Sequence, residues 1–206
     1  DSLNLLARIN NQIRSLAAFD NPVYYKNKNL GYSNYNNSSV IYLGEDINGY
    51  IHLPRGVYDK LIKKNNEANI DYKITNERTN GRIIDVSFNG ILRPEQEKAI
   101  NEILNYNDGI LEAATAFGKT VVCSYLIAKR KISTLILLQS SSLLKQWQEE
   151  LEKFLNINEE LPTYKTKTGI IKKRKSLIGQ LQANTFTLTG IIDIAMIGTL
   201  TNRDDI

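Results

Sequence analysis

The spacing of hydrophobic residues changes partway along the chain. Over residues 1–19 apolar side chains recur at helical spacing, which predicts an amphipathic helix. Asn21-Pro22 marks the expected end of this helix, because proline disfavours a helical conformation in the residue before it. Apolar runs at residues 40–43 and 50–53 predict two strands with a turn-rich connection at residues 44–49.

Another helix is expected from Pro54, since proline is favoured in the first turn of a helix. Two further strands are expected near residues 70–74 and 82–88. Together these elements indicate a small N-terminal α+β domain with a mainly antiparallel sheet. It spans residues 1–88 and meets the rest of the chain at Asn89-Gly90.

From Ile91 onward strand and helix patterns alternate, which is typical of an α/β domain with a parallel sheet. The run Thr134–Leu138 is continuously apolar, as buried parallel strands are. This second domain spans residues 89–206. Its expected elements are a helix at 94–106, a strand at 109–113, a helix at 121–128, a strand at 134–138, a helix at 142–154, a strand at 191–196 and a capped helix start at Thr199.

The junction between the expected strand 109–113 and the next helix carries a phosphate-loop pattern, Ala113-Ala114-Thr115-Ala116-Phe117-Gly118-Lys119-Thr120. Backbone N–H groups of such a turn, and of the helix N-terminus behind it, face the phosphates of a nucleotide. Lys119 places a positive charge at the same oxygens, and the Thr120 hydroxyl is suited to bind Mg²⁺. We therefore predict a nucleotide site at Thr115, Ala116, Phe117, Gly118, Lys119 and Thr120.

This loop departs from the common glycine pattern. Ala113 stands where the first glycine of the motif is usual, and Ala116 is a second substitution. Gly118 keeps the position at which the backbone approaches phosphate most closely. We expect Phe117 to pack against the protein and not against a base. The alternative interpretation is an ordinary strand-to-helix turn with a surface lysine.

Composition narrows the class of protein. The apolar fraction of 42% and the charged fraction of 23% are ordinary for a soluble globular protein, and no apolar run is long enough to span a bilayer. Cys123 is the single cysteine, which excludes an internal disulfide, fits a reducing cytoplasm and favours packing as a small hydrophobe. His52 is the single histidine, and no Cys/His spacing suited to structural zinc occurs.

The formal charge of +4 permits a nucleic-acid partner without demanding one. Two stretches are candidates for contact with it. One is the basic run Lys165–Lys175, with Lys172, Lys173, Arg174 and Lys175 at its end. The other is Tyr24–Tyr35, where tyrosines alternate with lysines and asparagines, as stacking surfaces do. Each stretch is equally well interpreted as a solvated loop.

Ahead of the phosphate loop stands Leu92-Arg93-Pro94-Glu95-Gln96. The amide of Gln96 offers an acceptor and donors that match the edge of adenine, and the plane of Arg93 can stack on the base. An exposed helix start is the alternative interpretation. Because the pair precedes a phosphate loop, we predict that Arg93 and Gln96 bind the adenine of ATP.

The order of these motifs resembles superfamily 2 helicases of the DEAD/DEAH type, in particular those similar to restriction-enzyme subunit R and the primase-associated helicases of prokaryotic conflict systems. The resemblance spans most of the chain. The motifs that carry it are residues 92–96 (glutamine motif), 114–120 (motif I), 135–138 with 143–147 (motif Ia) and 192–196 (the strand of motif Ic), with weaker likeness at 15–22 and 53–56.

The resemblance implies a first RecA-like domain that uses ATP with Mg²⁺ and moves on nucleic acid, with DNA expected and RNA not excluded. It places the strand contact of motif Ia near Ser141 and Gln146, although Gln139-Ser140-Ser141 lacks the basic or polar pair usual there. It also implies a second RecA-like domain with an arginine finger, and a nuclease or primase as a possible partner. Motif II, of the Asp-Glu-x-His type, does not occur before Ile206, so we expect a truncated, inactive fragment.

Two other function classes remain open at this point. One is a nucleic-acid-binding module with a vestigial phosphate loop, against which the intact Lys119 and Thr120 count. The other is a different phosphate-loop enzyme, such as a kinase or GTPase, against which the predicted adenine contact of Arg93 and Gln96 counts. A competition between ATP and GTP would separate the latter from a helicase.

Overall fold

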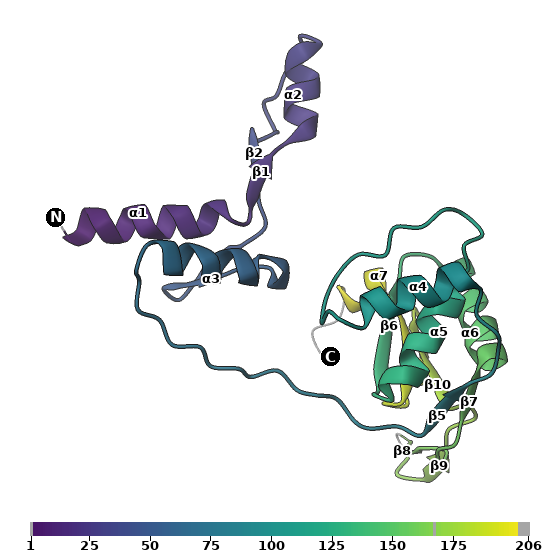
Figure 1. Cartoon of the computed structure of the whole chain (residues 1–206). Coiled ribbons are helices and arrows are strands. Elements are labelled where there is room, and N and C mark those ends of the chain that lie inside the picture. Colours follow the sequence, from purple (N-terminus) through teal and green to yellow (C-terminus); the bar gives the residue numbers. More distant parts are fainter. Residues whose placement is uncertain (1, 167, 202–206) are drawn as a thin grey trace. The chain divides into compact units, whose positions relative to one another are not determined.

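The computed structural model describes residues 2–166 and 168–201. Two compact units make up the chain, Asp1–Asn76 and Glu77–Ile206 (Figure 1). Among the described residues, no helix is both long enough and apolar enough to cross a membrane.

The N-terminal unit begins with the expected amphipathic helix, α1 (Ser2–Ser15), which ends earlier than the hydrophobic pattern indicated. The chain then forms β1 (Ala18–Asp20), which pairs antiparallel with β2 (Val40–Tyr42). Between these two strands lies α2 (Pro22–Asn29). We expected Asn21-Pro22 to end a helix and did not predict that a second helix begins there. Asn21 caps α2 by accepting hydrogen bonds from the first amides, and proline at the first helical position suits a helix start.

A second antiparallel pair joins β3 (Glu45–Ile47) to β4 (Tyr50–His52), so the predicted connection at residues 44–49 is itself half strand. The 3-10 turn η1 (Arg55–Val57) leads into α3 (Tyr58–Glu67), as the helix expected from Pro54 required. The strand predicted near residues 70–74 does not form. Its alternation is too short to bury a face, and residues 71–83 are all exposed.

The second unit is built on a four-stranded sheet in the order β11-β10-β12-β6. Strands β10, β12 and β6 run parallel, which confirms the predicted parallel α/β arrangement. The short β11 pairs antiparallel with β10 at one edge. The bounds are β6 (Thr134–Leu138), β10 (Ile178–Gln182), β11 (Thr185–Phe186) and β12 (Ile192–Met196).

Helix α6 (Ser141–Phe154) packs on the sheet at β6 and β12, with α5 (Lys119–Arg130) beside it, and α4 (Pro94–Ile103) packs against α5 (Figure 1). In α6 the apolar side chains recur every three to four residues, so that one stripe faces inward. Leu144 and Leu151 of that stripe are buried in the core, and Trp147 packs against it. The remaining core side chains come mainly from Ile127, Ala128, Leu138, Leu155, Ile178, Ile191, Ile192 and Ile194.

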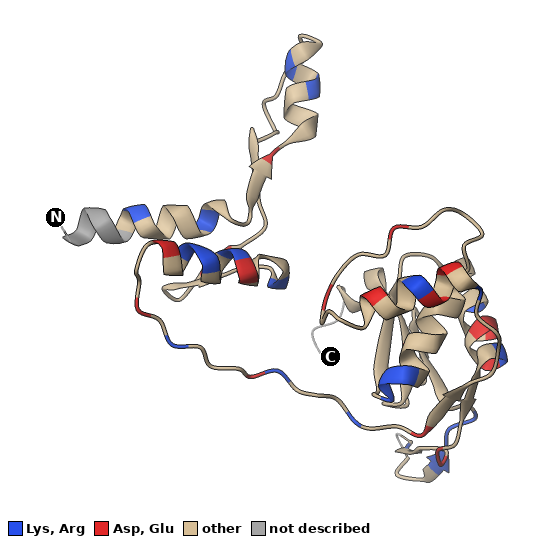
Figure 2. Cartoon of the chain, in the orientation of Figure 1, with Lys and Arg blue, Asp and Glu red and all other residues tan. Residues whose placement is uncertain are grey.

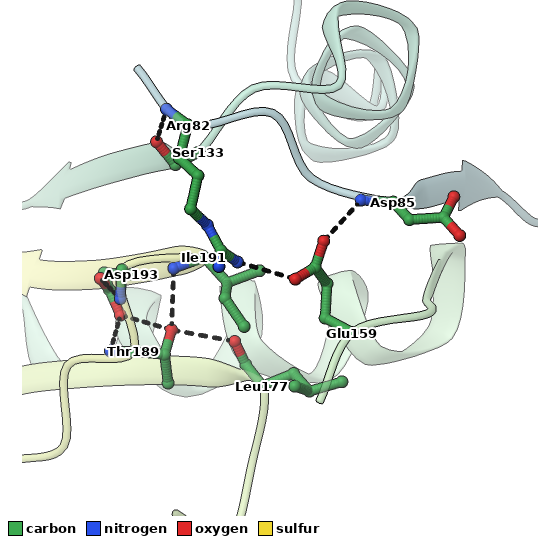
Figure 3. Close-up of polar contacts among 9 residues, drawn as sticks. Arg82, Asp85, Ser133, Glu159, Leu177, Thr189, Ile191 and Asp193 are labelled. Carbon is green, nitrogen blue, oxygen red and sulfur yellow. Dashed lines mark hydrogen bonds and ion pairs between the residues drawn. The ribbon is translucent and has the colours of Figure 1, made fainter. Parts of the chain in front are cut away.

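The segment just before residue 89 belongs to the second unit by its contacts. Strand β5 (Val86–Phe88) pairs antiparallel with β7 (Leu155–Ile157), and Ile84 and Val86 are each only 1% exposed. Glu159 fixes this segment further, accepting hydrogen bonds from the Arg82 guanidinium and the Asp85 amide, each at 2.8 Å (Figure 3). The two units therefore divide between Asn76 and Glu77, ahead of the predicted seam at Asn89-Gly90.

The connection between β10 and β12 is held by a buried carboxylate, Asp193 (Figure 3). Asp193 accepts hydrogen bonds from the amides of Thr189 and Gly190, both at 2.8 Å, and from the Thr189 hydroxyl at 3.0 Å. A Cβ atom at Gly179 would lie 2.0 Å from the same carboxylate, so only glycine fits beside it. This network keeps a buried charge hydrogen-bonded, as burial of an ionised group requires.

Three expectations for the second unit are corrected. The segment 109–113 is not a strand but an irregular connection, in which Ile110 is 97% exposed while Leu111 and Ala113 are partly buried. Strand β6 forms where predicted, yet it lies at the sheet edge with Leu135 and Leu137 exposed, so it is not covered on both faces. The last helix, α7 (Ile197–Leu200), begins before Thr199.

Candidate nucleotide-binding site

The predicted phosphate loop lies between the irregular segment 109–113 and α5. Two positive backbone angles shape it, with φ of 65° at Ala116 and 82° at Gly118. Gly118 is the residue from which α5 starts, and glycine adopts such angles without the steric cost that a side chain incurs. The loop therefore turns sharply into the N-terminus of α5, where unpaired amides and the helix dipole favour an anion.

Lys119 and Thr120 are the first two residues of α5. The Lys119 ammonium donates a hydrogen bond to the carbonyl of Ala114 at 3.0 Å, which places its charge over the mouth of the loop. Further along the helix, the Ser124 hydroxyl bonds back to the carbonyl of Thr120 at 2.8 Å and is buried. The first turn of α5 therefore carries the Lys119 ammonium and the Thr120 hydroxyl next to the helix N-terminus.

The start of α4 braces the phosphate loop from outside. The Gln96 amide nitrogen donates to the carbonyl of Phe117 at 2.8 Å, and Arg93 donates to the same carbonyl and, at 3.4 Å, to that of Ala116. The Gln96 amide oxygen in turn accepts from the Arg93 backbone amide at 2.9 Å, which also caps α4. One buried side chain thus links the first turn of α4 to the loop.

The structure therefore brings Arg93 and Gln96 onto the loop of residues 115–118, although they stand more than twenty positions earlier in the chain. Gln96 is only 3% exposed, and both ends of its amide already have partners within the protein. The Arg93 side chain is half exposed and pairs with Glu95 at 3.1 Å. Its guanidinium is therefore the more accessible of the two groups for a base.

Sequence reasoning did not foresee that Glu95 or the carbonyls of Ala114, Ala116 and Phe117 take part in this site. Glu95 stands between Arg93 and Gln96, so its position in the motif was the available signal. The carbonyls leave no signal in a sequence, because every residue has one. Backbone groups of this kind become visible only when the turn itself is known.

The two sets of predicted nucleic-acid residues lie at different ends of the sheet. Ser141 and Gln146 are exposed on the first turns of α6, directly after the C-terminal end of β6. Lys172–Lys175 lie instead just before the N-terminal end of β10. Because β6 and β10 are parallel members of one sheet, these ends are opposite. The structure does not bring the two sets together.

Cys123 lies on α5 and is partly buried. Burial raises the pKa of its thiol above the ordinary value, because it disfavours the thiolate. The neutral thiol is a weak nucleophile. This agrees with the expectation that Cys123 packs as a small hydrophobe.

Comparison with known proteins places this site in a family. The profile of the type III restriction enzyme res subunit matches residues 89–204, which is more than half of the chain and includes the phosphate loop, β6 and β12. The chain therefore belongs to this family of superfamily 2 helicases.

Individual relatives are also similar to parts of this chain. "Putative helicase 109L" of Invertebrate iridescent virus 3 is 34% identical over 100 residues, 47% of this chain and 30% of that protein. The DNA 3'-5' helicase XPB of Kineococcus radiotolerans is 33% identical over 78 residues, 37% of this chain and 14% of that protein. The DNA 3'-5' translocase XPB2 of Sulfurisphaera tokodaii is 33% identical over 67 residues, 32% of this chain and 15% of that protein. The aligned region spans less than a third of each relative.

Proposed function

We propose that this chain is the N-terminal, ATP-binding part of an ATP-dependent DNA helicase or translocase. The observation that carries the proposal is the loop of residues 114–120, which turns into the N-terminus of α5 with Lys119 over its mouth and Gln96 bracing its outer side. Membership of a helicase family supports the same interpretation. In this proposal residues 89–206 are a first RecA-like domain and residues 1–88 form an accessory domain.

Each residue of the site has a specific part in binding ATP with Mg²⁺. The amides of Thr115, Ala116 and Gly118 would face the phosphates, and Lys119 would neutralise charge on them. The Phe117 amide instead donates to the carbonyl of Ala114 at 3.3 Å and so would hold the turn. The Thr120 hydroxyl would be the protein's ligand to Mg²⁺, with phosphate oxygens and water completing the shell. Arg93 and Gln96 would lie toward the adenine.

Movement on DNA would need more groups than this loop. Phosphoryl transfer also requires a carboxylate that holds Mg²⁺ and orients water, and an arginine that stabilises the developing charge. No Asp-Glu-x-His sequence occurs among the 206 residues. We therefore propose that a motif II carboxylate and a second RecA-like domain complete the enzyme, and that the chain alone binds ATP with negligible turnover.

We propose DNA as the nucleic acid on which the intact protein acts, because two of the similar proteins are named as a DNA helicase and a DNA translocase. Ser141 and Gln146 would contact a DNA strand. They follow the C-terminal end of β6, and the phosphate loop lies at this same end of the parallel strands. A nuclease or primase partner belongs to the same proposal, supported by the family. A cytoplasmic location belongs to it as well, supported by the family and by the single cysteine, which fits a reducing compartment.

Titration of the 206-residue chain with a fluorescent ATP analogue and Mg²⁺ tests the proposal. We expect saturable binding, and we expect Lys119→Ala to weaken it at least tenfold, because removal of a charged partner from phosphate costs about 1.5–3 kcal/mol. Lys129→Ala is the matched control: it removes the same charge from the other end of the same helix, where Lys129 is exposed.

Equal binding by the Lys119→Ala and Lys129→Ala variants would contradict the assigned site. No binding by the unmodified chain would favour the alternative of a nucleic-acid-binding module with a vestigial phosphate loop. Circular dichroism melting of each variant is needed to show that the loss of binding is not a loss of fold.

A further inference from the structure

The basic run after α6 folds into an ordered hairpin that the sequence did not predict. Its strands are β8 (Thr163–Lys165) and β9 (Ile171–Lys173), paired antiparallel. The Thr166 hydroxyl accepts a hydrogen bond from the Ile170 amide at 3.0 Å within the turn. At the base, the Arg174 amide donates to the carbonyl of Pro162 at 2.7 Å. Lys172 and Lys173 therefore stand on a paired strand, and Arg174 and Lys175 follow it directly.

All charged residues in and around the hairpin are basic. Between Glu160 and Asp193 the sequence contains six basic residues and no acidic residue, whereas the whole chain carries a formal charge of only +4. Figure 2 shows the β8–β9 hairpin as a blue region of the second unit. In the part of the chain that the structure describes, Lys172, Lys173, Arg174 and Lys175 form no ion pair with an acidic side chain.

One face of the hairpin carries an aromatic ring between two basic side chains. Tyr164 and Lys172 are directly opposite in the pairing register, so their side chains lie on the same side of the hairpin. The Arg174 guanidinium lies over the Tyr164 ring, 4.4 Å from its centre, and also donates to the carbonyl of Phe186 at 3.2 Å. These contacts hold Arg174 in place while its remaining donors stay available.

This face opens onto a groove of about 540 Å³ between the hairpin, α6 and β10. Gln148 of α6 and Gln180 of β10 line its wall and hydrogen-bond to each other. Apart from Ile178, the described lining consists of basic, amide and hydroxyl side chains and contains no carboxylate; the basic ones are Lys172, Lys173, Arg174 and Lys175. Such a lining suits a ligand that presents repeated negative charges and hydrogen-bond acceptors.

The groove lies at the opposite end of the sheet from the phosphate loop. Helix α5 begins at the loop and ends next to the N-terminal end of β6, and the hairpin leads into the N-terminal end of the parallel strand β10. Twelve residues of α helix separate the two ends by roughly 18 Å. A ligand in the groove would therefore not occupy the nucleotide site.

We infer that this groove binds the sugar-phosphate backbone of DNA, as a contact separate from the one at Ser141 and Gln146. Its partner rests on the proposed DNA-acting function, but its chemistry does not depend on the nucleotide site. Arg174 covers one face of the Tyr164 ring, so the basic side chains contact phosphates while the ring supports them and does not stack on bases. Binding through phosphates alone carries no sequence preference.

The test is fluorescence anisotropy of a labelled DNA duplex with the 206-residue chain, without nucleotide, between about 50 and 200 mM salt. The unmodified chain should bind duplexes of unrelated sequence alike, with affinity that falls as salt rises. Replacing Lys172, Lys173, Arg174 and Lys175 with alanine should flatten the plot of log affinity against log salt by about 0.9 for each phosphate that the protein no longer neutralises.

Because Arg174 anchors the hairpin, the triple variant K172A/K173A/K175A provides a second test that leaves its contacts with Tyr164 and Phe186 intact. It should still flatten the slope and keep the thermal unfolding profile of the unmodified chain. The matched control is K60A/K63A/K64A, which removes the same charge from α3 in the N-terminal unit. This control should leave the slope nearly unchanged.

An unchanged slope in a folded triple variant overturns the inference, and so does an equal flattening in the α3 control, which would mean that only total charge matters. The Lys119→Ala variant should keep the full slope, and the triple variant should keep ATP binding. A failure of the groove can therefore be distinguished from a failure of the nucleotide site.

Discussion

Gln96 has a double structural role that a single substitution can separate from adenine binding. Gln96→Ala removes the donor to the Phe117 carbonyl and the acceptor for the Arg93 amide. Leaving such buried groups unpaired costs about 1–3 kcal/mol, so we predict weaker binding of ATP and GTP alike through a loosened loop. If Gln96 also contacts adenine, ATP affinity should fall further than GTP affinity.

Competition of ATP and GTP against a fluorescent analogue measures this ratio. Equal losses for the two nucleotides would leave Gln96 as a brace of the loop and contradict the adenine contact. No loss for either would contradict both roles. Glu95→Ala, which removes the exposed partner of Arg93, is the control for disturbance of the helix start.

At the level of single residues, the sequence predicted a set of nucleotide-binding side chains, and their role in binding stays a prediction. The order of residue types gave Lys119, Thr120, Arg93 and Gln96 as a set, because the chemistry of phosphate and adenine restricts which side chains can serve. It could not show that Gln96 is buried with its amide already paired. Burial depends on which segments pack above a residue, and neighbours in sequence do not determine that.

Among the elements, the segment before the phosphate loop is where pattern and structure differ most. Gly109-Ile110-Leu111 has the apolar composition of a strand, but it has no strand partner in the described structure, and Gly109 and Ile110 stay exposed. A helix satisfies its backbone hydrogen bonds within itself, so its apolar side needs only a surface to pack on. A strand must also find a neighbouring strand for its backbone N–H and C=O groups. The helices α4, α5 and α6 were consequently predicted well, and strand 109–113 was not.

Substitution of Ile110 checks this description. With its side chain 97% exposed, Ile110→Ser should change the free energy of unfolding by less than about 0.5 kcal/mol in urea. Leu151→Ala, at a fully buried position on α6, should lower it by about 2–5 kcal/mol. A cost for Ile110→Ser close to that of Leu151→Ala would mean that residues 109–113 form a buried strand after all.

Short strands were also missed where residue types favour loops. The hairpin β8–β9 is mostly lysine, threonine and isoleucine around a glycine turn, and its charge hid a strand pattern that needs only three paired residues on each side. Helix α2 was missed because a proline was taken as the end of one helix when it begins the next. The hairpin depends on backbone pairing between its two strands, which residue types alone do not reveal. Helix α2 depends on a local contact, because the Asn21 side chain accepts hydrogen bonds from the Val23 and Tyr24 amides.

On the scale of the whole molecule, the sequence predicted two units but not their boundary. The change of hydrophobic period falls at residue 89, yet β5 just before it pairs with β7 in the second unit. An isolated strand gives no indication of which neighbour it will join. The 88/89 boundary thus stays a prediction about domains, while the observed contacts divide the chain at residues 76 and 77.

Two shorter chains distinguish these boundaries. We predict that residues 77–206 unfold cooperatively in urea and that residues 89–206 are less stable by at least about 3 kcal/mol. The shorter chain lacks Ile84 and Val86, each 1% exposed, and a buried aliphatic side chain contributes about 1.5–3 kcal/mol. Equal stability of the two chains would place the boundary at residue 89.

The free edge of the four-stranded sheet affects how the isolated chain behaves in solution. Strand β6 is the last strand on its side, so its outer N–H and C=O groups have no strand beside them among the described residues, and Leu135 and Leu137 are 56% and 50% exposed. An apolar edge of this kind offers a template on which another copy can add a strand. Aggregation should therefore become more severe with concentration, and dilute samples are the better choice for every titration above.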